Sequence, residues 1–432
     1  MSRRASADPY LPGHGDRSFS VDHYHLDLDY RPAGNRLSGT ATLSCRAEAD
    51  VEAITLDLAG LEAAKVAVDG ARVKYTHRGT RLQVRTGPLA AGSDFEVSVK
   101  YGGSPRPLRL PGLGAAGWEE LTDGVIVAAQ PHGAPTWYPC NDRIDDKATW
   151  SLTIAAPADY TVAFSGTALA SLRSGSSLRW WFEQTAPMAP YLATLQIGRY
   201  RSIAQEAAVP MSVLAPARLH GAGLTAAFGD QPTMLAVFSE LFGPYPFASY
   251  TTVITDDDLE IPLESQALST FGANFCTGEW EAVRLVAHEL AHSWFGNAVT
   301  AAGWRDIWLH EGFACYAEWL WSEHAGLTST EDRARHHYRK LAGLPQDLVL
   351  ADPGPAEMFD DRVYKRGALT LHALRGRAGD EEFFDLLRSW VSEHTGGSVT
   401  TADFVAHCRT RIGEDAAELV ADWVEQPALP QW

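Results

Sequence analysis

Long apolar runs and an excess of basic residues are both missing from this 432-residue sequence. No stretch approaches the roughly 20 apolar residues that a membrane-spanning helix needs, so we expect no membrane partner. Lysine and arginine together number 36, against 54 aspartate and glutamate residues, and the formal net charge is −18. Because nucleic-acid binding normally needs a clustered basic face, this composition also argues against a nucleic acid as partner.

Cysteine is scarce as well, with five residues and no Cys-x-x-Cys pair. The odd number and wide spacing argue against a disulfide framework or a zinc ribbon, so we expect reduced, buried thiols. Arg3 and Arg4 are followed by prolines and polar residues where a secretory signal would place an apolar run. These features predict a cytoplasmic protein. The cysteines are Cys45, Cys140, Cys276, Cys315 and Cys408.

The sequence does contain a strand-rich first half and a helix-rich second half. Hydrophobic residues make up 45% of the chain, which is enough for a sizeable core, and the length favours more than one domain. Alternating apolar and polar residues, with turn signals such as Asp69-Gly70, predict an antiparallel β saddle or sandwich over residues 1–203. From Thr225 the period becomes helical, which predicts a mainly α-helical domain over residues 204–432. The clearest predicted strands are 24–30, 66–69, 82–84, 95–99 and 178–182.

One pentapeptide, His288-Glu289-Leu290-Ala291-His292, carries most of the chemical information. The run that starts at Trp280 reads as a helix that continues through it to Phe295, before Gly296. Four residues advance a helix by about one turn, so the two imidazoles point the same way and can bind one Zn²⁺. Glu289 lies one step round the helix, beside the metal's open position, and we assign it as the general base.

Glu311 is available as the third metal ligand. It follows His292 after 18 intervening residues, at the start of another predicted helix that runs through Leu320. Two imidazoles and one carboxylate leave the fourth tetrahedral position for water, as catalytic zinc sites do. Water activated by one zinc ion per chain, with Glu289 as proton carrier, makes peptide hydrolysis the predicted reaction.

The segments HELAHSWFGN at 288–297 and WLHEGFA at 308–314 resemble the aminopeptidase N family of zinc metallopeptidases, the gluzincins. Weaker similarity at 137–142 and 242–246 extends the resemblance over nearly the whole chain. It implies an α+β architecture in which a β saddle domain precedes a thermolysin-like, mainly helical catalytic domain. The segment 422–430 is similar to the close of that catalytic domain, so we expect a short form without the family's C-terminal helical domain.

The resemblance also implies residues that bind the substrate. Tyr364, in Val363-Tyr364-Lys365-Arg366-Gly367-Ala368, is similar to the family tyrosine that hydrogen-bonds the oxyanion. Glu264 is similar to the glutamate that binds the free α-ammonium. Ile261-Pro262 replaces the family's Gly-Ala, and proline offers no backbone N–H to a bound peptide. Gln130 and His132 compete as the second contact to the ammonium, and we favour Gln130.

Asn297 and Glu318 are candidates for orienting the zinc-bound imidazoles through their second ring nitrogens. The sequence therefore predicts a zinc aminopeptidase that acts on peptides with a free N-terminus. A zinc endopeptidase or an epoxide hydrolase on the same scaffold is the alternative if amine recognition at Glu264 fails. Outside the enzymes, a non-catalytic peptide-binding protein is the alternative, although its expected mark, a lost ligand or base, is not found. The preferred N-terminal residue and the oligomeric state stay open.

Overall fold

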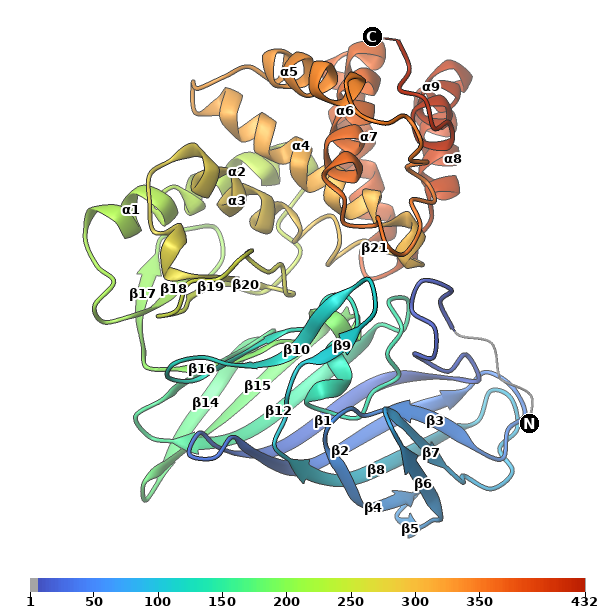
Figure 1. Ribbon diagram of the computed structural model, residues 1–432, viewed down its shortest axis with the longest axis vertical. Helices are drawn as coiled ribbons and strands as arrows, with labels where there is room; N and C mark the ends of the chain where they lie inside the picture. Colours follow the sequence, from blue (N-terminus) through green and yellow to red (C-terminus); the bar gives the residue numbers. More distant parts are fainter. Residues whose placement is uncertain (1–6, 432) are drawn as a thin grey trace.

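The computed structural model describes residues 7–431, and it divides into two unlike halves (Figure 1). Strands fill the N-terminal half, drawn in blue and green, and helices fill most of the C-terminal half, drawn in yellow to red. The predicted class, a β-rich domain followed by a helical catalytic domain, is confirmed. The predicted boundary after residue 203 falls inside β17 (Tyr200–Gln205), and its position stays a prediction. None of the helices among the described residues is long and apolar enough to cross a bilayer.

The largest sheet is built around β1 (Phe19–Arg31), whose alternate residues Tyr24, Leu26 and Leu28 are buried. This alternation is the period of a strand with one face on the core. Only one pair of its strands departs from the predicted antiparallel pattern, since β1 pairs in parallel with β12 (Ala148–Pro157). The two strands are separated by a long excursion through other strands, which a parallel pair requires and a hairpin does not allow.

Three sheets make up the N-terminal half. Its other strands are β2 (Arg36–Ala47), β3 (Ile54–Asp57), β4 (Glu62–Val68), β5 (Ala71–Arg72), β6 (Tyr75–Arg78), β7 (Arg81–Val84), β8 (Asp94–Gly103), β9 (Leu108–Leu110), β10 (Gly114–Glu120), β11 (Val125–Ala128), β13 (Thr161–Phe164), β14 (Thr167–Ser174), β15 (Ser177–Met188) and β16 (Leu195–Gly198). The strand orders are β14-β15-β12-β1-β2-β8-β4-β5, β13-β16-β11-β10-β9 and β3-β7-β6.

A four-stranded sheet that the sequence did not predict lies between the two halves in Figure 1. It consists of β17, β18 (Met211–Pro216), β19 (Tyr250–Ile254) and β20 (Leu268–Phe271) in that order. The loop from β19 to β20 carries Glu264, and a bridge between Leu263 and Thr270 fixes the backbone beside it. This sheet therefore positions the residue that was predicted to bind the substrate amine.

The helical half confirms the predicted change of period. Its elements are α1 (Ala222–Phe228), α2 (Gln231–Phe242), α3 (Trp280–Ala291), α4 (Trp308–His324), α5 (Thr330–Ala342), α6 (Asp361–Ala378), α7 (Asp380–His394), α8 (Thr401–Arg411) and α9 (Glu414–Glu425), with the short strands β21 (Thr300–Ala301) and β22 (Ser398–Val399). Helix α3 ends at Ala291 rather than at the predicted Phe295. After His292 the chain turns, because Gly296 takes a φ of 119° and Asn297 N–H donates to His292 O at 3.1 Å.

Helices α4 and α6 cross where two glycines face each other. A Cβ added to Gly312 would lie 2.7 Å from Gly367 Cα, closer than real Cβ atoms approach other atoms. The absence of side chains at this crossing lets the two backbones touch. Glu311 precedes one glycine and Tyr364 lies three residues before the other, so the crossing sets their separation.

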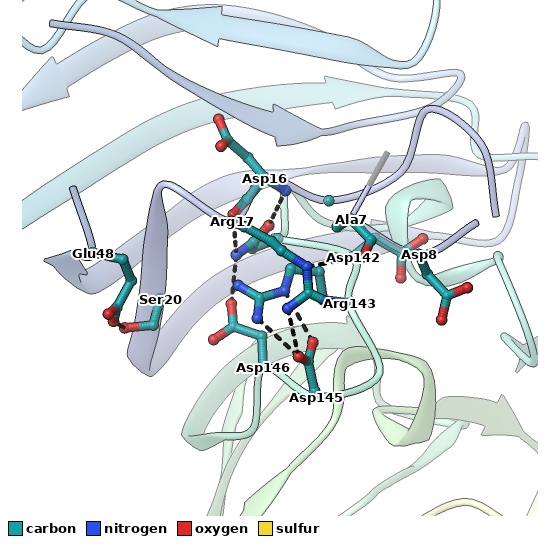
Figure 2. Close-up of polar contacts among 12 residues, drawn as sticks. Ala7, Asp8, Asp16, Arg17, Ser20, Glu48, Asp142, Arg143, Asp145 and Asp146 are labelled. Atoms are coloured by element: carbon teal, nitrogen blue, oxygen red, sulfur yellow. Dashed lines mark hydrogen bonds and ion pairs between the residues drawn. The ribbon is translucent and has the colours of Figure 1, made fainter. Parts of the chain in front are cut away.

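An ion-pair cluster holds the N-terminal segment against the loop that leads into β12 (Figure 2). Arg17 Nη1 lies 3.0 Å from Asp145 Oδ2, and Arg143 donates from Nε and Nη2 to the same carboxylate at 3.0 Å each. Asn141 Nδ2 donates to Asp146 Oδ2 at 2.6 Å. The cluster fixes the chain just before Lys147.

Lys147 joins the two halves through the turn that follows α3. Its Nζ donates to the carbonyl oxygens of Asn297 at 2.9 Å and of Ala298 at 3.0 Å, which belong to the turn after α3. The Asp8 carboxylate adds a second link, because it accepts Trp304 N–H at 2.9 Å. The N-terminal half therefore supports the loop that follows α3.

Candidate metal centre

Helix α3 brings His288, in its last turn, together with His292, its C-cap residue. Four residues separate them, so both rings leave the same helix face, with ring centroids 4.7 Å apart in an edge-on arrangement. Both side chains are buried. Glu311, in the first turn of α4, is also buried and faces both rings. These three residues form a group whose ligand atoms all lie within 4.8 Å of one another.

Hydrogen bonds to Nδ1 of His288 and His292 orient each ring so that Nε2 points toward the metal group. His288 Nδ1 lies 2.8 Å from Glu318 Oε1, and His292 Nδ1 lies 3.0 Å from Phe295 O. A carboxylate and a carbonyl both accept, so each ring holds a proton on Nδ1, which leaves Nε2 as the nitrogen that can bind a metal. Both Nε2 atoms face one oxygen, Glu311 Oε2, at 3.3 Å from His288 and 3.5 Å from His292.

These separations suit a tetrahedral metal ion. Nitrogen and carboxylate ligands lie about 2.0–2.2 Å from Zn²⁺, which places two ligand atoms about 3.3–3.5 Å apart at the tetrahedral angle. The two distances from Glu311 Oε2 agree with that spacing. The residues present therefore fit zinc in number, type, aim and spacing, and they leave one position open.

The charges around the group favour a cation there. Burial raises the pKa of Glu289 to about 8, the imidazoles of His288 and His292 oppose the rise, and the carboxylates of Glu264 and Glu311 add to it. Burial lowers the pKa of His288, but its bonds to Glu311 and Glu318 outweigh this and raise the pKa to about 10. The raised pKa values mean that Glu289 and His288 bind protons in the absence of a metal. A divalent cation bound at this group would displace these protons.

The metal group lies at the bottom of a cleft of about 370 Å³, within the usual range for ligand sites. Gln130 from the N-terminal half lines the cleft together with Glu264, and Gln130 Nε2 donates to Glu264 Oε1. His132 is buried away from the cleft, with Nε2 on Leu108 O at 3.0 Å. The structure thus brings Gln130, and not His132, to the predicted amine site.

Tyr364 lines the same cleft from α6. Its ring stacks on His288 with centroids 6.0 Å apart and an interplanar angle of 23°. Burial, with the nearby carboxylates of Glu311 and Glu264, raises its pKa well above the ordinary value of 10.0. The phenol therefore keeps its proton at neutral pH and can donate it in a hydrogen bond.

Asn297 has a different task from the one predicted. Its Nδ2 donates to the backbone oxygens of Glu264 at 3.1 Å and Ser265 at 3.3 Å. The second ring nitrogen of His292 is hydrogen-bonded to Phe295 O instead. The turn after α3 brings Asn297 back to the β19–β20 loop, which helical periodicity could not predict. Asn297 therefore fixes the loop of the amine site rather than an imidazole.

Sequence reasoning missed several residues that line the cleft, among them Arg284, Phe359 and Lys365. Arg284 had a usable signal, since it lies four residues before His288 and so on the same face of α3. Ile261 also lines the cleft, and 62% of its surface is exposed. Ile261 and Pro262, which differ from the Gly-Ala of the family pattern, therefore line the cleft that holds the metal group.

Comparisons with known proteins agree with the geometry. Residues 20–192 match the profile of the peptidase M1 N-terminal domain, and residues 227–423 match the peptidase family M1 domain. A crystal structure of an M1 zinc metallopeptidase variant from Deinococcus radiodurans, bound to a Tyr-Ser-Ala substrate, has 32% identity and a TM-score of 0.91, with 99% of each chain covered.

Curated relatives are more distant. A leucyl aminopeptidase of Saccharolobus solfataricus is 24% identical over 95% of this chain, and aminopeptidase B of Mus musculus is 27% identical over 90% of it. The chain spans 54% of the length of the first and 65% of the second. From the two matched domains and the close, full-length structural relative, the chain belongs to peptidase family M1.

Proposed function

We propose that this protein is a zinc-dependent aminopeptidase that removes N-terminal residues from peptides with a free N-terminus. The observation that carries the proposal is one cleft holding both a convergent metal group and an amine site. His288, His292 and Glu311 would hold Zn²⁺, and Glu264 with Gln130 would bind the α-ammonium. An amine site beside the metal group limits cleavage to the first peptide bond.

Amine binding falls to the two residues that already contact each other. Gln130 donates to Glu264 through Nε2, so its own carbonyl oxygen and the second oxygen of Glu264 can accept from an ammonium. Both groups are acceptors of the right charge or polarity for a cationic amine. An N-acetylated N-terminus carries no such charge and keeps only one N–H donor for the two acceptors.

The hydrolytic step uses Glu289 and Tyr364. When bound, Zn²⁺ supplies Lewis-acid polarisation of the scissile carbonyl and lowers the pKa of water. Glu289 takes the proton from the attacking water and passes it to the leaving nitrogen. Tyr364 donates a hydrogen bond to the carbonyl oxygen as negative charge develops on it.

A cytoplasmic location is part of the proposal. All five cysteines are free, and four of them are buried. Free thiols in every position are typical of a reducing compartment.

The test pairs free and N-acetylated forms of the same aminoacyl and peptide substrates, with and without a zinc chelator. Chelator-sensitive cleavage of the free forms alone would support the proposal. Equal cleavage of the blocked forms would replace it with a zinc endopeptidase, and no cleavage of any form would leave a peptide-binding protein. In the same assay Glu289→Gln should keep the metal and lose turnover, and loss of metal from this variant would contradict its role as base.

A further inference from the structure

A positively charged side chain lies on the cleft wall, one helical turn beyond the metal group. Arg284 and His288 on α3 and His292 at its C-cap are spaced four residues apart, and all three line the cleft. Four residues of an α-helix rise about 6 Å. The guanidinium therefore belongs to the same cleft as the metal group but is displaced from it along the helix axis.

Arg284 and the amine site lie at opposite ends of this line. Asn297 follows α3 on the His292 side, and its amide holds the backbone of Glu264 at 3.1 Å. Arg284 is on the His288 side, where its Nη1 lies 3.3 Å from Glu318 Oε2. On this order, an extended peptide with its ammonium at Glu264 and its first carbonyl at the metal group would continue toward Arg284.

The guanidinium has donors left for a ligand. Arg284 Nε bonds Glu281 at 2.6 Å, and the Glu281 side chain is 76% exposed, so this pair is a weak competitor. Glu318 takes one further N–H, whereas a guanidinium carries five. Lys365 lines the same cleft and adds a second positive charge, with its Nζ 3.2 Å from Cys315 Sγ.

We propose that Arg284 forms a subsite for the C-terminal carboxylate of a short peptide, and that tripeptides are the preferred substrates. This rests on the proposed aminopeptidase function and adds a substrate class to it. Extended peptide spans about 3.3–3.6 Å per residue, so the carboxylate of a tripeptide lies about 7 Å beyond the scissile carbonyl. That length matches the single helical turn between His288 and Arg284.

The positions of the charged side chains in the cleft support this direction for a bound peptide. Arg284 and Lys365, the arginine and the lysine that line the cleft, lie away from Glu264, where Glu318 is 3.3 Å from Arg284 and Asp361 is 3.9 Å from Lys365. A short peptide is a zwitterion, and its C-terminal carboxylate would reach these two cationic side chains while its ammonium meets the acceptors of Glu264 and Gln130. The planar fork of arginine suits a carboxylate in particular, because it can donate two parallel hydrogen bonds.

The experiment compares matched tripeptides with a free or an amidated C-terminus, and a hexapeptide of the same N-terminal sequence. For the unaltered protein, kcat/KM should be at least about tenfold higher for the tripeptide acid than for its amide. In Arg284→Met this ratio should fall toward one, and Arg284→Lys should keep part of it. Arg333→Met is the matched control, since Arg333 lies over the Trp280 ring at 4.1 Å and should leave the ratio unchanged.

Binding measurements separate the subsite from the proposed function. Metal-loaded Glu289→Gln allows calorimetric titration of the same acid and amide without turnover, and metal content is measured for every variant. A preference for the acid in binding supports the subsite even if no peptide is hydrolysed. Equal binding and cleavage of acid and amide, or an unchanged ratio in metal-loaded Arg284→Met, would overturn it.

Discussion

The contact between Glu318 and His288 allows a graded test of how the metal group is held in place. Glu318 Oε1 lies 2.8 Å from His288 Nδ1 and fixes both the tautomer and the aim of the ring. Replacing such a partner typically weakens metal binding 10–100-fold, or about 1.4–2.8 kcal/mol. Glu318→Gln keeps an acceptor oxygen but loses the charge, so we expect about a tenfold loss. Glu318→Ala loses the acceptor too, so we expect about a hundredfold loss.

The assay for these variants is a zinc competition titration against a chelating dye. Glu323→Gln is a matched control on the same helix, because the Glu323 carboxylate bonds Thr330 at 2.8 Å, away from the metal group. It should bind zinc as the unaltered protein does. A zinc affinity of Glu318→Ala equal to that of the control would refute the orienting role. Weaker zinc binding by Glu318→Gln than by Glu318→Ala would refute the benefit of the retained acceptor oxygen.

Three further changes have expected outcomes. Tyr364→Phe should lower kcat in steady-state assays much more than it changes KM, and an unchanged kcat would remove the phenol from the reaction. Burial, with nearby positive charge, lowers the pKa of His337 from 6.5 to about 4, so its contribution to stability is lost as pH falls through that window. His337→Phe should therefore lose less unfolding free energy between pH 7 and pH 4.5 in urea titrations, and an equal loss would exclude His337 as the cause. Gly312→Ala should destabilise the protein by about 1–3 kcal/mol in thermal unfolding, because its Cβ would meet Gly367, whereas Gly376→Ala meets nothing within 4 Å and should not destabilise.

Helical periodicity accounts for what the sequence could predict about the site. The spacing of His288 and His292 fixes their common face, and Glu318 lies seven residues after Glu311 on one helix, so the structure places these four side chains together. Strand alternation likewise predicted the β-rich half, including β1.

Contacts between segments far apart in the sequence were out of reach. The parallel pairings of β1 with β12, of β18 with β19 and of β19 with β20 depend on crossovers that leave no local pattern. Whether Gln130 or His132 meets Glu264 depends on how the two halves meet, and the target of Asn297 depends on the turn after α3. Local periodicity carries no information on either point.

The contact between Gly312 and Gly367 has a consequence for how this protein is mapped by mutagenesis. An alanine scan reads importance from what is lost when a side chain is removed, but here alanine would add an atom where the two backbones leave no room. Loss of activity in alanine variants at these two positions would be mistaken for the loss of a functional side chain, although glycine has none. Substitution of each glycine by side chains of increasing size would instead measure how closely α4 and α6 must pack to keep the separation between Glu311 and Tyr364.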